Sequence, residues 1–182
     1  GLKGGLKYAE EAILNLELVK HLDKPVGFYD PNNPALRGSD SAKDPEEKEN
    51  ISLEERSVKL RSPMFSFSNT DMAFSENLLV AGSYHGFNMY ELDNDGVPNL
   101  VTSVVCPGGQ GDVSIVGDLL IMSVEQTRGR LDCGREGVGT EPSMERFRGI
   151  RIFDISDISN PMQVGAVQTC RGSHTHSVVA GP

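Results

Sequence analysis

The stretch "GIRIFDISDISNPMQVGAVQTC", residues 149–170, decides the fold, because an earlier stretch of the chain repeats its pattern. The earlier stretch, "GFNMYELDNDGVPNLVTSVVC", covers residues 86–106. Each has an alternating segment, then a turn rich in Asp, Asn and Pro, then a Val-rich segment that ends in cysteine. Alternation with a period of two is typical of β-strands, and such turn residues favour tight connections. The two stretches therefore indicate two copies of one pair of strands.

The repetition extends to the residues that precede each pair. Three sets of positions match: Asp71 with Asp112, residues 78–80 with residues 119–121, and Cys106 with Cys170. The aspartates are offset by 41 residues (112 − 71), and the cysteines by 64 (170 − 106). The difference predicts an insertion of 23 residues (64 − 41) in the second copy, at about 125–147, which is rich in glycine.

A repeat of about 40 residues that supplies four short strands is typical of a β-propeller blade. The expected strands are 72–74, 78–81, 87–92 and 100–105 in the first copy, and 113–116, 119–123, 150–155 and 163–169 in the second. We therefore expect an all-β fold, a partial β-propeller with blades at 70–106 and 111–170. Residues 174–182 are expected to begin a third blade.

The residues before the repeats have a different character. In "GLKYAEEAILNLELVKHL", residues 5–22, apolar side chains recur at three- and four-residue steps. This spacing predicts a short amphipathic helix from about Tyr8 to Leu22, within an N-terminal helical arm at 1–24. Residues 25–69 are polar and rich in proline, without periodicity, and are expected to form a linker or a segment that wraps the surface.

The second copy and its continuation, "RGIRIFDISDISNPMQVGAVQTCRGSHTHSVV", resemble the LVIVD-repeat β-propeller proteins. In that family a strand ending in Asp-Ile-Ser is followed by a Pro-containing turn and a Val-rich outer strand. The resemblance covers residues 70–180, about 60% of the chain. It implies a β-propeller fold, with this chain as the N-terminal portion of such a protein. It implies no particular activity, because a fold does not fix a function.

Two histidines near the end of the sequence are candidate ligands. Counted from the cysteine that ends each copy, His176 falls at the position of Asp112 and Asp71. The innermost strands of a propeller line its central channel, so these three side chains are expected to converge at the channel mouth. Carboxylates and an imidazole there could bind a divalent metal, or could simply face water in the channel. His174, on the preceding loop, is a weaker candidate for the same site.

The three cysteines allow one disulfide and one remaining thiol. Cys106 and Cys170 end equivalent outer strands, and Cys133 lies in the insertion. In a propeller these connections emerge on the same face, so Cys133 can reach either of the other two. A catalytic thiol is the alternative, although no cysteine has a neighbouring histidine in a known nucleophile pattern.

Charge and hydropathy restrict the expected partners. The chain has 17 basic and 26 acidic residues, a formal net charge of −9, and no basic cluster. Nucleic acids and anionic membrane surfaces are therefore not expected partners. No window approaches the ~20 apolar residues that a membrane span needs.

The expected function is that of a binding or scaffolding module outside the cytoplasm. Two blades and one strand cannot close a ring of four to eight blades, so remaining blades or a protein partner are expected to complete it. A start at Gly1 fits a processed secreted protein and a fragment equally. We expect a periplasmic, cell-surface or secreted location. The alternative is a metal-dependent enzyme with a site at the channel mouth, loosely similar to the selenium-binding, methanethiol-oxidase-like propellers.

Overall fold

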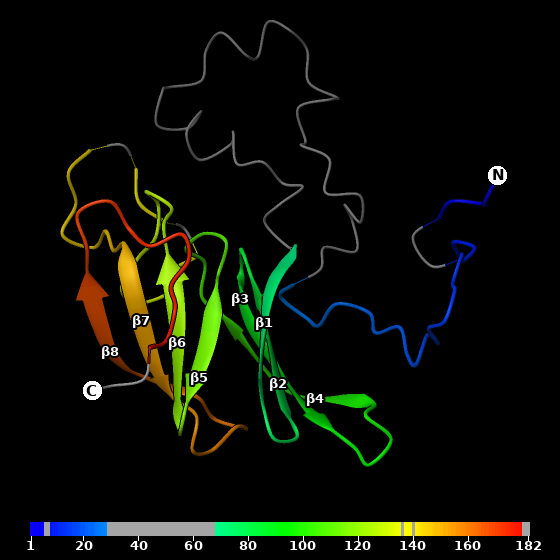
Figure 1. Ribbon diagram of the computed structural model, residues 1–182. Coiled ribbons are helices and arrows are strands. Elements are labelled where there is room, and N and C mark those ends of the chain that lie inside the picture. The colour runs from blue at the N-terminus through cyan, green and yellow to red at the C-terminus, as the bar shows by residue number, and fades with distance from the viewer. Residues whose placement is uncertain (6–7, 29–67, 136, 140, 180–182) are drawn as a thin grey trace, which may run out of the picture.

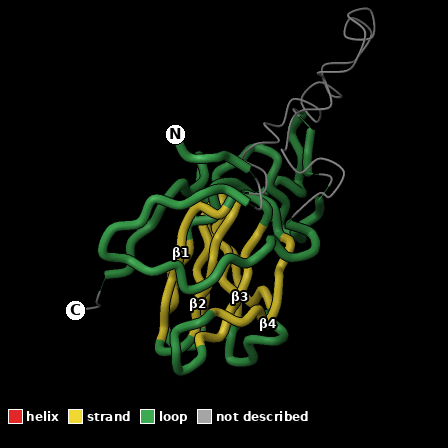
Figure 2. The backbone as a smooth tube through the Cα atoms, turned by 90° about the vertical axis from the view of Figure 1, so that its right-hand side faces the viewer, coloured by secondary structure: helices red, strands yellow, loops and turns green. Residues whose placement is uncertain are grey.

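The computed structural model describes residues 1–5, 8–28, 68–135, 137–139 and 141–179. They form two four-stranded antiparallel sheets in which consecutive strands are neighbours (Figure 1). The first sheet contains β1 (Asn69–Ser75), β2 (Leu78–Ser83), β3 (Gly86–Leu92) and β4 (Pro98–Val105). The second contains β5 (Val113–Val116), β6 (Leu119–Val124), β7 (Gly149–Asp154) and β8 (Met162–Gln168). The all-β prediction is confirmed, and Figure 2 shows strands and loops but no helix in the described residues.

One apolar core joins the two sheets, which face each other with β1 beside β5 (Figure 1). Its buried side chains come from both sheets: Val80, Phe87 and Met89 from the first, and Val113, Leu120, Met122 and Phe153 from the second. The rings of Phe87 and Phe153 meet edge to face with their centroids 5.0 Å apart. Burying a side chain of this size contributes about 1.5–3 kcal/mol, so this core fixes the two sheets relative to each other.

The two sheets match in register as well as in strand order. Val80 pairs with Met89 between β2 and β3, and Ile121 pairs with Ile152 between β6 and β7. The pairing of the outer two strands is irregular at the same place in both sheets, just after Met89 and just after Ile152. A bulge places an extra residue on one strand at a fixed point. Its recurrence identifies the second sheet as a structural copy of the first.

A glycine begins the third strand of each sheet. Gly86 has φ +137° and Gly149 has φ +148°, values that L side chains rarely adopt. A Cβ atom at either position would lie 2.0 Å from a carbonyl oxygen, that of Val104 or Val167. These two glycines are therefore required by the backbone, and they lie 63 residues apart (149 − 86).

This register shows that the offset inferred from the cysteines is one residue too large. The Cys106 N–H donates to the carbonyl oxygen of His85, and the Thr169 N–H donates to that of Arg148. Thr169, and not Cys170, is therefore the counterpart of Cys106. The extra residues between β6 and β7 accordingly number 22 (63 − 41).

The predicted helix from Tyr8 to Leu22 is wrong, since these residues form no helix in the structure. Leu14 and Leu16 are 84% and 82% exposed, so the apolar stripe that predicted the helix has little to pack against. A helix of this length is marginal in water without tertiary contacts, which explains the difference. No helix among the described residues has the length and apolar character needed to cross a membrane.

The predicted linker at 25–69 lies mostly outside the described residues, which exclude 29–67. At its start, Phe28 is buried, and its ring meets that of His85 edge to face at 5.8 Å. The predicted first strand of a third blade, 174–182, is described only to residue 179 and is not a strand there. A strand requires a hydrogen-bonded neighbour, and the described residues place none along it; the segment runs past β5 (red in Figure 1).

Candidate functional site

Three loops meet at one end of the two sheets, and they carry most of the candidate residues. They are the loop 106–112 after β4, the insertion 125–148 after β6, and the loop 169–175 after β8. Two backbone N–H groups of the insertion, those of Glu125 and Gln126, donate to the Gly108 carbonyl oxygen at 3.0 and 2.9 Å. The Ser173 N–H donates to the Val124 carbonyl oxygen at 3.0 Å. This loop end is thus built by both repeats together.

A polar cluster lies where the last of these loops meets β6. The Nδ1 atom of His176 is 2.9 Å from Oδ2 of Asp112 and 2.9 Å from Oγ of Ser123. The Ser123 hydroxyl is also 2.9 Å from that of Ser173. The side chains of His176 and Asp112 are only 13% and 17% exposed. The structure therefore brings together two of the three predicted ligands.

Each predicted aspartate has a backbone partner on the next segment. The Asp71 carboxylate accepts the Val113 N–H at 2.9 Å, and the Asp112 carboxylate accepts the His176 N–H at 2.8 Å. His176 therefore stands at the position of Val113, and Thr175 stands at the position of the aspartates. The predicted equivalence of His176 with Asp112 is wrong by one residue. Each aspartate therefore links its own repeat, by a hydrogen bond, to the residue that begins the next segment of the chain.

The described residues contain no group of three or more His, Cys, Asp or Glu side chains placed to hold a metal ion. His174 does not join Asp112, and its Nδ1 atom instead contacts the carboxylate of Glu125. That carboxylate also accepts the Gln110 N–H at 3.3 Å. Neither contact was predicted, because both join loops whose paths the repeat pattern does not specify. A metal at this end stays a prediction, with Asp112 and His176 as its adjacent pair.

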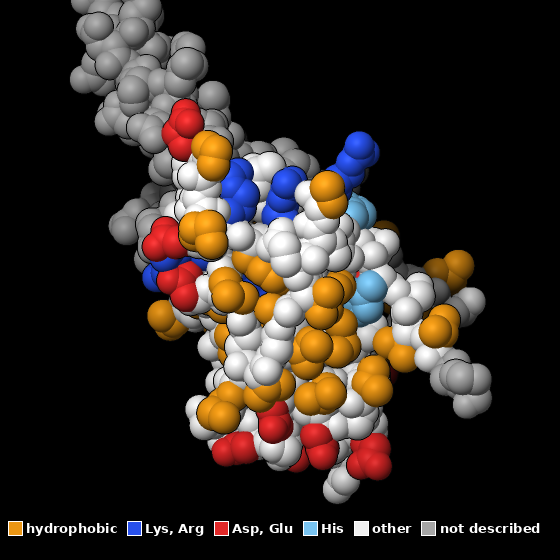
Figure 3. Space-filling model, turned by 90° about the vertical axis from the view of Figure 1, so that its left-hand side faces the viewer, with side chains coloured by type: hydrophobic (Ala, Val, Ile, Leu, Met, Phe, Trp, Pro, Cys, Tyr) orange, Lys and Arg blue, Asp and Glu red, His pale blue; other side chains and the backbone are white. Residues whose placement is uncertain are grey.

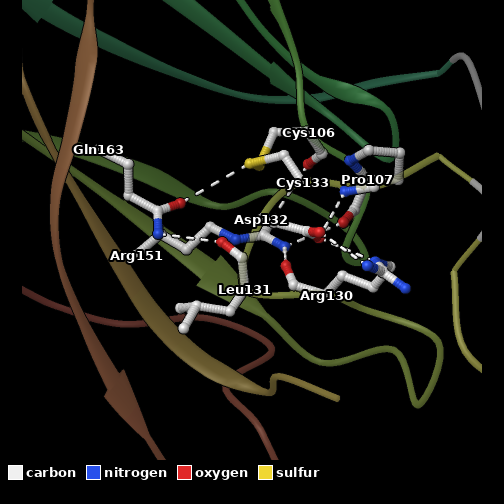
Figure 4. The surroundings of a disulfide bond; sticks show 9 residues. Cys106, Pro107, Arg130, Leu131, Asp132, Cys133, Arg151 and Gln163 are labelled. Atoms are coloured by element: carbon white, nitrogen blue, oxygen red, sulfur yellow. Dashed lines mark hydrogen bonds and ion pairs between the residues drawn. A yellow bond between two sulfur atoms is a disulfide. The ribbon is translucent and has the colours of Figure 1, made fainter. Parts of the chain in front are cut away.

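A disulfide fastens the base of the insertion to the first sheet (Figure 4). Cys133 bonds to Cys106 across a Cα–Cα distance of 4.4 Å, which confirms one of the two predicted pairings. Cys170 is a free, exposed cysteine. Beside the disulfide, the side-chain amide of Gln163 on β8 donates to the Leu131 carbonyl oxygen at 3.1 Å. The insertion is thus tied to both sheets at its base.

Arg151 on β7 is fully buried beneath this loop end (Figure 4). Its guanidinium donates to the carbonyl oxygens of Cys106 at 3.1 Å, of Pro107 at 3.2 Å, and of Arg130. It also lies 5.6 Å from the centre of the Phe147 ring. Burial lowers the pKa of Arg151 to about 10, so the side chain remains charged at neutral pH. One buried cation therefore organises the backbone of two loops.

A second arginine orders the insertion itself. The Arg130 guanidinium donates to both carboxylate oxygens of Asp132, at 2.8 and 2.7 Å, and to Glu145 at 2.5 Å. The hydrogen bond from Arg130, with one from the Gly134 N–H, holds the pKa of Asp132 well below its usual range. Met144, next to Glu145, is fully exposed. The insertion therefore combines fastened residues with a side chain that is open to solvent.

No known protein family, curated protein or solved structure matches this chain. The geometry described above is therefore the basis for assigning a function.

The Asp112 carboxylate is expected to hold residues 174–179 in place. Replacing Asp112 by alanine removes the acceptor of the His176 N–H. It also removes the carboxylate that contacts the Nδ1 atom of His176. Losing an acceptor for a partly buried donor costs about 1–3 kcal/mol. Amide hydrogen exchange at His176 should become faster, while exchange in β2 and β3 stays slow. Asp95→Ala, in an exposed turn of the first sheet, is the control; equal exchange at His176 in both variants would contradict the assigned role.

Proposed function

We propose that this chain belongs to an extracytoplasmic β-propeller of the LVIVD-repeat kind, which binds or scaffolds a protein partner through its loop end. The main support for this proposal is the insertion between β6 and β7. The first sheet joins its second and third strands with two residues, Tyr84 and His85, and the second sheet uses residues 125–148. The extra residues are held by a disulfide, by Arg151 and by the Arg130 network. A loop that is fastened in this way loses little conformational entropy on binding.

The disulfide supports a location outside the cytoplasm. Disulfides persist in oxidising compartments and are rare where thiols are kept reduced. Cys106 and Cys133 lie in the two loops that the site is built from, so oxidation supports the binding geometry. A periplasmic, cell-surface or secreted location agrees with this chemistry.

Site-specific crosslinking tests the binding proposal. A photoreactive amino acid at Met144, whose side chain in the insertion is fully exposed, should give a covalent adduct with one discrete protein in the cells that make this chain. The matched control carries the same amino acid at Asp95, in the exposed turn between β3 and β4. Adducts from both positions alike, or none from Met144 in the oxidised protein, would refute binding through the insertion.

One observation favours the alternative of a metal-dependent enzyme. Asp112 and His176 are in contact, and Nε2 of His176 is buried without a hydrogen-bond partner among the described residues. Elemental analysis of the purified chain, beside Asp112→Asn and His176→Ala, tests this alternative. Stoichiometric metal in the parent that both variants lose would favour the enzyme, and equal traces in all three would rule out this pair as ligands.

A further inference from the structure

The insertion is rich in arginine, but its guanidinium groups are engaged within the chain. Guanidinium groups that donate hydrogen bonds to other residues of this chain include those of Arg128, Arg130, Arg146 and Arg148. The Arg146 group, for example, donates to the carbonyl oxygens of Gly139 and Glu141 at 2.6 and 2.7 Å. Much of the positive charge of the insertion is therefore already used to hold the loop together.

The carboxylates beside Arg130 face outward instead. The side chains of Asp132 and Glu145 are each 61% exposed, whereas that of Arg130 is 10% exposed. One guanidinium and two carboxylates leave a net charge of −1 (1 − 2) in this network. An approaching partner therefore meets carboxylate oxygens before it meets the cation.

Two exposed apolar side chains lie beside these carboxylates. The Leu131 N–H donates to the Glu145 carbonyl oxygen at 3.3 Å, and Met144 directly precedes Glu145 in the chain. Leu131 is 49% exposed, and Met144 is fully exposed. Figure 3 shows acidic and hydrophobic side chains beside one another at the left edge of the molecule. Apolar side chains next to charges are typical of a binding surface, where burial gives affinity and the charges at the rim select the partner.

The backbone that carries these side chains is held on both sides. The side-chain amide of Gln163 on β8 donates to the Leu131 carbonyl oxygen at 3.1 Å. The Glu145 N–H donates to the Ser143 hydroxyl at 3.2 Å, and the Arg146 N–H donates to the Ser143 carbonyl oxygen at 3.3 Å. Because this surface is ordered before a partner arrives, little entropy is lost in shaping it on binding.

We propose that the insertion binds a protein surface that has an apolar pocket bordered by lysine or arginine side chains. Leu131 and Met144 enter the pocket, and the carboxylates of Asp132 and Glu145 face the bordering cations. This inference rests on the proposed function, because it names the chemistry of the partner that the insertion binds.

A second copy of this chain fits that description poorly. Residues 68–127 contain no lysine or arginine. Arg130 and Arg151 are buried, and Arg146 is held by carbonyl oxygens of its own loop. Charge complementarity therefore favours a different, basic protein as the partner.

Crosslinking from a photoreactive methionine analogue at Met144, with the full chain in an extract of the cells that make it, tests this chemistry. Raising NaCl from about 0.05 to 0.5 M should lower the adduct yield, because salt screens exposed ion pairs. Glu145→Gln keeps an acceptor for Arg130 without the charge, and should lower the yield about twofold to fivefold at low salt only. Glu145→Lys should lower it further. Leu131→Ala should lower it about tenfold at both salt concentrations, through the lost apolar contact.

Asp95→Asn, in the exposed turn between β3 and β4, is the matched control and should leave the yield unchanged. A yield that is insensitive to salt and to Glu145→Gln, or that rises with Glu145→Lys, would overturn the inference. So would an adduct of twice the mass of the chain, because the partner would then be a second copy. Each of these outcomes leaves binding through the insertion intact, whereas the absence of any Met144 adduct would refute the proposed function as well.

Discussion

Replacing Arg151 by alanine is expected to lower the free energy of unfolding by about 3–5 kcal/mol, the largest effect of any single change proposed for this chain. The guanidinium is fully buried and donates to three backbone carbonyl oxygens. Alanine would leave those oxygens without their donor, at about 1–3 kcal/mol each where no water reaches them. It would also leave a cavity beside Phe147, whose ring Arg151 approaches.

Equilibrium urea unfolding measures this loss. Arg151→Lys keeps the positive charge but cannot reach three carbonyl oxygens from one planar group, so an intermediate loss is expected. Arg171→Ala is the control, since Arg171 is exposed on the loop after β8, and it should stay within about 0.5 kcal/mol of the parent. A loss at Arg151 no larger than at Arg171 would show that the loops are organised without it.

The sequence predicted the strands well because the apolar alternation that identifies a strand also builds the core. Phe87 and Phe153 are apolar members of the alternating segments in the two quoted stretches, and their rings meet in the structure. The register was wrong by one residue because cysteines served as markers. Cys106 is placed by its disulfide, whereas Gly86 and Gly149 are placed by a backbone conformation that only glycine adopts readily. Aligning the glycines would have given the right offset.

The candidate site was less predictable than the fold. Arg151 and Phe153 lie on one face of β7, and Ile155 continues the alternation just after the strand ends. A charge among inward-facing apolar positions is a signal of a buried, hydrogen-bonded group. That signal was present in the sequence. No signal in the sequence indicated the contacts of His174 with Glu125 and of Ser123 with His176, because these contacts depend on how three loops of different length fold over one another.

Replacing Cys133 by serine is expected to lower the free energy of unfolding by about 3 kcal/mol, from the loss of the cross-link. The bond closes a loop between residues 27 apart in the chain, and the chain-entropy model gives about 3 kcal/mol for a 15-residue loop and more for longer ones. Cys133 is the better choice for replacement, because Cys106 is fully buried in the core. A serine hydroxyl at Cys106 would add the cost of a buried polar group to that of the lost bond.

The disulfide is expected to stabilise both the chain and the geometry of its loop end, and two measurements separate these effects. Urea unfolding should show the same loss for Cys133→Ser as for the parent under reducing conditions, and reductant should not destabilise Cys133→Ser further. Cys170→Ser removes the exposed free cysteine and should match the oxidised parent. Hydrogen exchange should quicken at residues 130–135, while β6 and β7 remain protected by the core. Unchanged exchange there would mean that Arg130 and Arg151 hold the base of the insertion without the bond, and crosslinking from Met144 should then survive reduction.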